Sequence, residues 1–172
     1  MRRGSYNRAL MAAAKELLPP EVELEVLDFS NLPIFNQDLE AAPPESVKEF
    51  KAKIKAADTV LFATPEYNYS IPGGLKNAID WASRPYGDNS WDGKPAGIMG
   101  ASGGMVGTAR AQYHLRQVFV FLNIHPLNRP EIMVPFAADK FDKDGKLIDE
   151  ETKGKLAEFL KALIDWTNQL KK

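Results

Sequence analysis

The stretch Thr64–Trp81, TPEYNYSIPGGLKNAIDW, decides how the rest of the chain is interpreted. A short apolar run, Thr59–Ala63, precedes it, and a pattern of helical period begins at Pro72. This order predicts a strand, a loop and a helix. The loop leaves the carboxyl end of the strand, which is where open α/β sheets bind their ligands.

The loop itself combines rigid ends with a dense mix of aromatic and hydrogen-bonding side chains. Each proline at its ends fixes one backbone torsion, and a flat heteroaromatic ligand needs both a surface and fixed polar groups around its edge. The alternative is a well-capped turn that leads into a core helix, because Pro with nearby Asn or Ser is ordinary at helix starts. The residues concerned are Pro65, Glu66, Tyr67, Asn68, Tyr69, Ser70 and Pro72.

The match of this stretch to one known signature is nearly continuous. TPEYNYSIPGGLKNAIDW resembles the signature of the NADPH-dependent FMN reductase family, which includes chromate, quinone and azo-dye reductases. The resemblance implies a flavodoxin-like three-layer α/β/α fold with a parallel sheet, in a single FMN-binding domain over residues 1–172. It also implies that Pro65, Glu66, Tyr67 and Asn68 hold the flavin ring, partly through backbone atoms.

A second loop with ligand-binding character follows the small-residue strand Ala96–Ala101. Its sequence is SGGMVGT, Ser102–Thr108, and its glycines let backbone N–H groups approach an electron-rich edge closely. The glycine spacing is weak by itself, but this loop also leaves the carboxyl end of a strand, beside the first loop if the two strands are neighbours. The family resemblance implies that Ser102, Gly103 and Gly104 meet the other edge of the ring.

The amino terminus predicts a helix over Tyr6–Leu18 with Ser5 as its N-cap. A helix start that carries Arg, Gly, Ser and Asn suits a phosphate, although a frayed terminus with a normal cap fits the residues too. The family binds the FMN phosphate with a loop of the form G-S-x-R-x-G-S-x-N. The resemblance therefore assigns Arg2, Ser5 and Asn7 to the phosphate.

The first half of that loop and the strand before it have no counterpart in this sequence. In a sheet of order 2-1-3-4-5 that strand is the central one, so we expect the central first strand to be missing. The favoured explanation is a start codon assigned too late, because Met1 falls at a variable position of the family loop. The other is a truncated chain that is unstable or uses a partner to fill the gap. The intact mass of the native protein distinguishes them.

Composition excludes several classes of function. The 172 residues suit one domain, and 22 Lys and Arg against 23 Asp and Glu give a net charge of −1, so we expect neither nucleic-acid nor membrane binding. There is no cysteine, and His114 and His125 lie far apart, so we expect no metal site. The lack of a signal peptide and of an apolar run of about 18 residues favours the cytoplasm.

The remaining segments predict helices and strands in alternation, which indicates a parallel sheet with helices on both faces. Trp81 is either a core residue or a subunit contact, and the turn-rich loop Arg84–Gly93 borders the flavin site, crosses to a neighbouring subunit or faces solvent. The expected elements are a strand at Glu21–Phe29, helices at Glu45–Ala57 and Pro72–Ser83, a helix ending near Leu122, a strand at Glu131–Val134 and a helix at Glu150–Lys172.

The resemblance implies an NAD(P)H-dependent FMN oxidoreductase, with NADPH or NADH as co-substrate. The acceptor is a quinone, azo compound, free flavin or chromate, and the assembly is a homodimer or homotetramer. No catalytic acid or base is expected, because hydride transfer needs none and the cofactor carries the chemistry. The alternatives are a flavodoxin-type electron carrier without its own NAD(P)H activity, which the net charge of −1 argues against, and a flavin-free module.

Overall fold

Helices and short strands alternate through the middle of the chain, over residues 45–126. A computed structural model describes residues 4–171. The elements are α1 (Tyr6–Leu17), α2 (Glu45–Ala56), β1 (Val60–Ala63), α3 (Gly73–Ala82), β2 (Pro95–Ala101), α4 (Ala109–Leu122), β3 (His125–Pro126), β4 (Ile132–Val134) and α5 (Glu150–Leu170), with short 3-10 helices at Gln37–Leu39 and Ala137–Asp139.

The sheet is parallel and β2 lies at its centre, with every residue of β2 buried. β1 pairs along one side of β2, with Ala63 opposite Met99. β3 and β4 pair in turn along the other side, and Ile132 of β4 also lies opposite Met99. Because all the strands run the same way, the loops that follow β1, β2 and β4 leave from one edge of the sheet.

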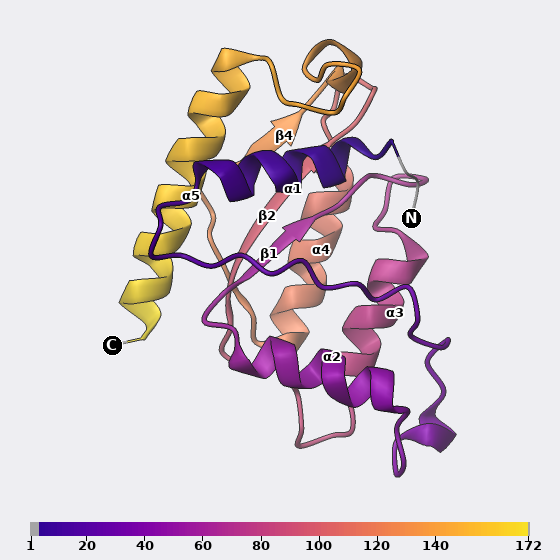
Figure 1. The fold of residues 1–172 in the computed structure, drawn as a ribbon. Helices are drawn as coiled ribbons and strands as arrows, with labels where there is room; N and C mark the ends of the chain where they lie inside the picture. The colour runs from indigo at the N-terminus through magenta and orange to yellow at the C-terminus, as the bar shows by residue number, and fades with distance from the viewer. Residues whose placement is uncertain (1–3, 172) are drawn as a thin grey trace.

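Helices cover both faces of this sheet, which confirms the predicted three-layer architecture. Side chains of β2 point alternately to the two faces: Ile98 joins a core cluster with α2, α3 and α4, and Met99 joins one with α1 and α5. Figure 1 shows α1 crossing in front of β1 and β2, with α5 beside it and α4 behind the sheet. The edge with the three loops lies beside the start of α1.

The predicted strand at Glu21–Phe29 is wrong. The segment is extended, and Val22, Leu24 and Leu27 are half-buried, but the residues have no strand assignment. Alternating burial shows that one face of an extended segment is covered. A β-strand also needs a hydrogen-bonded neighbouring strand. No backbone hydrogen bond joins this segment to β1 within residues 4–171, so the hydrophobic pattern is satisfied without a ladder.

The strand β3 was not predicted, because His125–Pro126 lies in a segment whose prolines indicate a rigid loop. The pairing survives because Pro126 occupies the position whose missing N–H faces away from β2. His125 N–H donates to Lys94 O at 2.8 Å and Leu127 N–H donates to Ala96 O at 2.7 Å. A short edge strand therefore tolerates the proline.

The question left open for Trp81 is answered by its surroundings. Its side chain is 1% exposed, and its Nε1–H donates to Pro33 O at 2.8 Å. The Phe35 ring packs edge-on against it with ring centroids 5.0 Å apart. Trp81 is thus a core residue that holds the apolar loop after Phe29 against α3.

Candidate FMN site

The start of α1 is fixed to the end of β2 by Asn7. Its side-chain Nδ2 donates to Ala101 O at 3.0 Å, and its Oδ1 accepts from Ala101 N–H at 2.9 Å. The side chain is buried and both of its polar atoms are used in these bonds. The group of Asn7 that remains for the predicted phosphate contact is therefore its backbone N–H. This N–H lies in the first turn of the helix and has no intrahelical partner.

The rest of the predicted phosphate region has the character of an anion site. Ser5 is the N-cap of α1, as predicted, yet its side chain makes no capping hydrogen bond, and the first turn holds no acidic residue. The positive end of the helix dipole is a feature that favours an anion. Arg2, the third predicted ligand, lies outside the described residues.

The loop after β1 contains a tight turn with strained backbone. Tyr67 and Ser70 exchange both backbone hydrogen bonds at 2.9 Å, and the two residues between them have positive φ, 51° for Asn68 and 65° for Tyr69. This is a type I′ turn, and a bulky residue such as tyrosine adopts that conformation at a cost. Tyr67 is 59% exposed and Tyr69 is 69% exposed, so a ligand can reach both residues.

Glu66 has a role that the sequence did not predict. Its Oε2 accepts hydrogen bonds from the backbone N–H groups of Arg110 at 2.9 Å and Ala111 at 3.2 Å, and its Oε1 pairs with Arg110 Nη1 at 3.1 Å. The carboxylate therefore satisfies the first turn of α4. The predicted contact of Glu66 with a flavin ring is left to its main-chain atoms.

Two further contacts fasten the same turn to α4. The Arg110 guanidinium lies 4.0 Å from the centre of the Tyr69 ring. The Ser70 hydroxyl forms a hydrogen bond of 2.8 Å with His114 Nδ1. The loop after β1 is thus held in one conformation by the helix that follows the second loop, and the two predicted loops form one unit.

Near the end of β2, the backbone approaches its neighbours so closely that only glycine fits at position 100. A Cβ on Gly100 would lie 2.0 Å from Thr108 Oγ1 and 2.6 Å from Thr64 O. Thr108 is fully buried and has φ 75°, which is unusual for a β-branched residue. Gln112 Nε2 donates to its hydroxyl at 3.1 Å, so α4 fixes this strained residue.

The tip of this loop is open. Gly103 and Gly104 are exposed, and a Cβ built on either would meet no heavy atom within 4 Å. Ser102 Oγ donates to Gly104 O at 3.3 Å. The predicted ring contacts at Ser102, Gly103 and Gly104 therefore belong to an accessible, hydrogen-bonded turn at the same edge as Tyr67.

A third loop, which the sequence did not indicate as part of the site, is bonded to the second. After β4, Phe136 N–H donates to Gly104 O at 3.2 Å and Ala137 N–H donates to Ser102 O at 3.0 Å. Phe136 has φ 48° and is 52% exposed. In the sequence, this loop is marked by nothing except its position after the last predicted strand. The residues that follow it are polar and indicate a plain turn.

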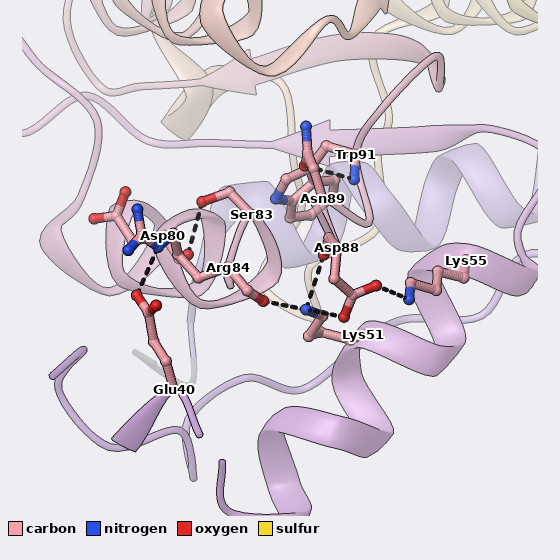
Figure 2. A network of polar contacts seen from close by, with 9 residues as sticks. All are labelled: Glu40, Lys51, Lys55, Asp80, Ser83, Arg84, Asp88, Asn89 and Trp91. Carbon is pink, nitrogen blue, oxygen red and sulfur yellow. Dashed lines mark hydrogen bonds and ion pairs between the residues drawn. The ribbon is translucent and has the colours of Figure 1, made fainter. Parts of the chain in front are cut away.

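The loop Arg84–Gly93 does not border these loops within one chain, because it joins the end of α3 to the start of β2 at the opposite edge of the sheet. Figure 2 shows how it is held on α2: Lys51 Nζ donates to Arg84 O, to Asp88 O at 2.9 Å and to the Asp88 carboxylate at 2.7 Å, and Lys55 pairs with the same carboxylate. Arg84 Nε pairs with Glu40 at 2.6 Å.

A cavity of about 430 Å³ opens beside the loop Arg84–Gly93, with Tyr86 and Phe121 among its lining residues. It lies at the far end of α3 from Gly103, so it is separate from the three loops described above. Elsewhere in residues 4–171 there is no group of three or more side chains placed to hold a metal ion, and no helix combines the length and apolar character that a membrane span requires.

The three converging loops and the helix N-terminus lie at the carboxyl edge of a parallel sheet, which is where flavodoxin-like folds bind their ligands. The sequence profile of the NADPH-dependent FMN reductase family matches residues 1–139. The chain belongs to this family, which confirms the resemblance seen in the sequence and the prediction of an FMN-dependent oxidoreductase that uses NAD(P)H.

Relatives cover nearly the whole chain. An NAD(P)H-dependent FMN reductase of Pseudomonas aeruginosa is 51% identical, over 99% of this chain and 92% of that protein. An NAD(P)H:quinone oxidoreductase of Solanum tuberosum is 51% identical, over 95% of this chain and 86% of that protein. Among solved structures, the flavoenzyme NAD(P)H:(acceptor) oxidoreductase of Paracoccus denitrificans superposes with a TM-score of 0.91 at 41% identity, over 98% of this chain and 93% of that one.

Proposed function

We propose that this protein carries electrons from NADPH or NADH through FMN to a quinone. The observation that supports it is the convergence of an uncapped helix start, an exposed aromatic turn and an open glycine turn at one edge of the sheet. Relatives named quinone oxidoreductases, such as the one from Solanum tuberosum, favour a quinone over an azo compound, free flavin or chromate.

The residues fit the three chemical parts of FMN. The phosphate would meet the start of α1, where Ser5 offers a hydroxyl, and Asn7 a backbone N–H. The ring would lie against the loop after β1, with Pro65, Tyr67 and Asn68 along one edge. Backbone N–H groups of Gly103 and Gly104 would face the other edge and favour negative charge there.

Bound FMN supplies the redox chemistry, because its ring takes a hydride from nicotinamide and passes electrons on to an acceptor. Overall, NADPH, one proton and the quinone give NADP⁺ and the hydroquinone. The part left to the protein is to hold the ring and exclude water. Glu66 and Arg110 do this indirectly, since their contacts fix the turn that carries Tyr67 and Tyr69.

Steady-state oxidation of NADPH with a naphthoquinone, and with no added reductase, tests this function. We expect sustained turnover in proportion to bound FMN. A flavodoxin-type carrier would hold FMN yet oxidise no NADPH by itself, and a flavin-free module would do neither. The same assay with NADH determines which nicotinamide is preferred.

The proposal includes assembly into a homodimer or homotetramer. The outer face of α4 presents Tyr113 beside the site and, in its last turn, Val120 at 83% and Phe121 at 80% exposure. Apolar side chains this exposed favour a contact with another copy. Light scattering of the wild type and of Val120→Lys/Phe121→Lys tests it: a multimer that the substitutions dissociate is expected, and a wild-type monomer contradicts it.

We also propose a cytoplasmic location, where NADPH is available. Fractionation of cells that produce the protein from its native gene checks this, and we expect the protein with cytoplasmic markers. Its recovery with membranes or outside the cell contradicts the proposal.

A further inference from the structure

Two bulky aromatic residues at the site have left-handed backbone, and both are exposed. Tyr69 has φ 65° and Phe136 has φ 48°. They lie on the loops after β1 and β4, and because β2 lies between these strands, they flank the glycine turn that follows β2. Tyr69 is stabilised by Arg110, whereas Phe136 belongs to neither buried core cluster of the described residues.

The fold gains little from a phenylalanine at position 136. Its backbone bonds fix the conformation, since its N–H donates to Gly104 O and its carbonyl accepts from Asp139 N–H at 3.0 Å. Gly or Asn would adopt that conformation with less strain. Phe136 is 52% exposed, so burial of the side chain does not fully offset the backbone strain. Strain that packing does not explain is a feature of ligand-contacting positions.

We propose that Phe136 is a specificity-determining residue whose ring packs against the flat, quinoid electron acceptor. This inference rests on the proposed quinone reductase function. The backbone bond to Gly104 places the ring beside the turn expected to meet the flavin, and a half-exposed ring there offers an acceptor a stacking or edge contact. A small inorganic acceptor such as ferricyanide has no ring to pack and does not need this contact.

The test compares two acceptors in Phe136→Gly, which removes the ring and relieves the backbone. We expect FMN content and ferricyanide turnover to stay at wild-type values. For a naphthoquinone we expect kcat/KM to fall about three- to tenfold, the range for loss of one aromatic contact. The melting temperature should stay the same or rise, because the lost ring packs little.

Two further variants complete the design. Phe136→Tyr keeps the ring and should keep wild-type kcat/KM for the quinone. Asn123→Gly changes another left-handed residue, at the far end of α4 (φ 56°), and should leave both acceptors unaffected.

The inference is overturned if Phe136→Gly keeps wild-type quinone kinetics, if both acceptors lose activity equally, or if its melting temperature falls by several degrees, which would make the ring a packing residue. A wild-type protein without NADPH–quinone activity would remove the proposed function and this inference together. An active wild type with an unaffected variant removes the inference alone.

Discussion

Glu66 and Arg110 are joined through both side chain and backbone: the carboxylate pairs with the guanidinium at 3.1 Å and accepts the Arg110 N–H at 2.9 Å. Residues of the loop after β1 and of the helix after β2 thereby form one unit. The pair explains how a turn with two left-handed residues keeps its shape in front of the glycine loop. It also makes the shape of the site sensitive to a residue that need not contact a ligand through its side chain.

Glu66→Ala should lower the free energy of unfolding by about 1–3 kcal/mol, because it leaves the N–H groups of Arg110 and Ala111 without their acceptor. Glu66→Gln keeps an oxygen acceptor and should lose less. Urea denaturation measures both. Glu45→Gln, which removes only an exposed ion pair with Lys48, serves as the control and should change little. Equal stability of Glu66→Ala and the wild type would contradict the assigned role.

Asn7→Ala and Ser5→Ala should separate structure from phosphate binding. Asn7→Ala removes two buried hydrogen bonds to Ala101 and should cost about 1–3 kcal/mol of stability in the flavin-free protein. Ser5→Ala removes a hydroxyl that makes no capping bond, so stability should hold while FMN affinity falls about tenfold. Denaturation without FMN and fluorescence titration with FMN give the two readouts. Unchanged FMN affinity in Ser5→Ala would remove Ser5 from the phosphate site.

Gly100→Ala and Gly104→Ala should differ sharply. A Cβ at Gly100 would overlap Thr108 Oγ1 and Thr64 O, and we expect a loss of stability of about 1–3 kcal/mol or more. A Cβ at Gly104 meets nothing within 4 Å, so the flavin-free fold should tolerate it. If the Gly104 backbone lies against the ring, FMN affinity should still fall. Wild-type FMN affinity in Gly104→Ala would place the ring elsewhere.

Asp149 should make the stability of the fold depend on pH in the acid range. A hydrogen bond from Lys140, followed by bonds from Thr152, lowers the pKa of the Asp149 carboxyl from 3.8 to about 2. A carboxyl with a lowered pKa in the folded state stabilises the fold above about pH 4, and this contribution is lost as the pH falls through about 2. Asp149→Asn should therefore show a smaller loss of stability between about pH 4 and pH 2, measured as urea midpoints. If the urea midpoint of Asp149→Asn fell as steeply over this pH range as that of the wild type, the assigned role of Asp149 would be contradicted.

The sequence was sufficient for the layered architecture and for two of the three loops that meet at the carboxyl edge of the sheet, because hydrophobic period and loop position are local properties. It did not show the features that depend on which distant residues of the chain come into contact. The strand expected at Glu21–Phe29 has the right alternation but no hydrogen-bonded neighbour in residues 4–171. The sequence also did not show that the side chains of Glu66 and Asn7 bond to α4 and β2. Phe136 carried no motif, and only its backbone angle and its bond to Gly104 draw attention to it.

The most direct test of the central claim is the visible absorption spectrum of the purified protein after desalting and after addition of FMN. We predict a flavin spectrum that corresponds to one FMN per chain. NADPH should bleach it without oxygen, and a quinone should restore it. A protein that neither retains nor takes up FMN would contradict the account, and one that binds FMN but is not reduced by NADPH would be a carrier instead.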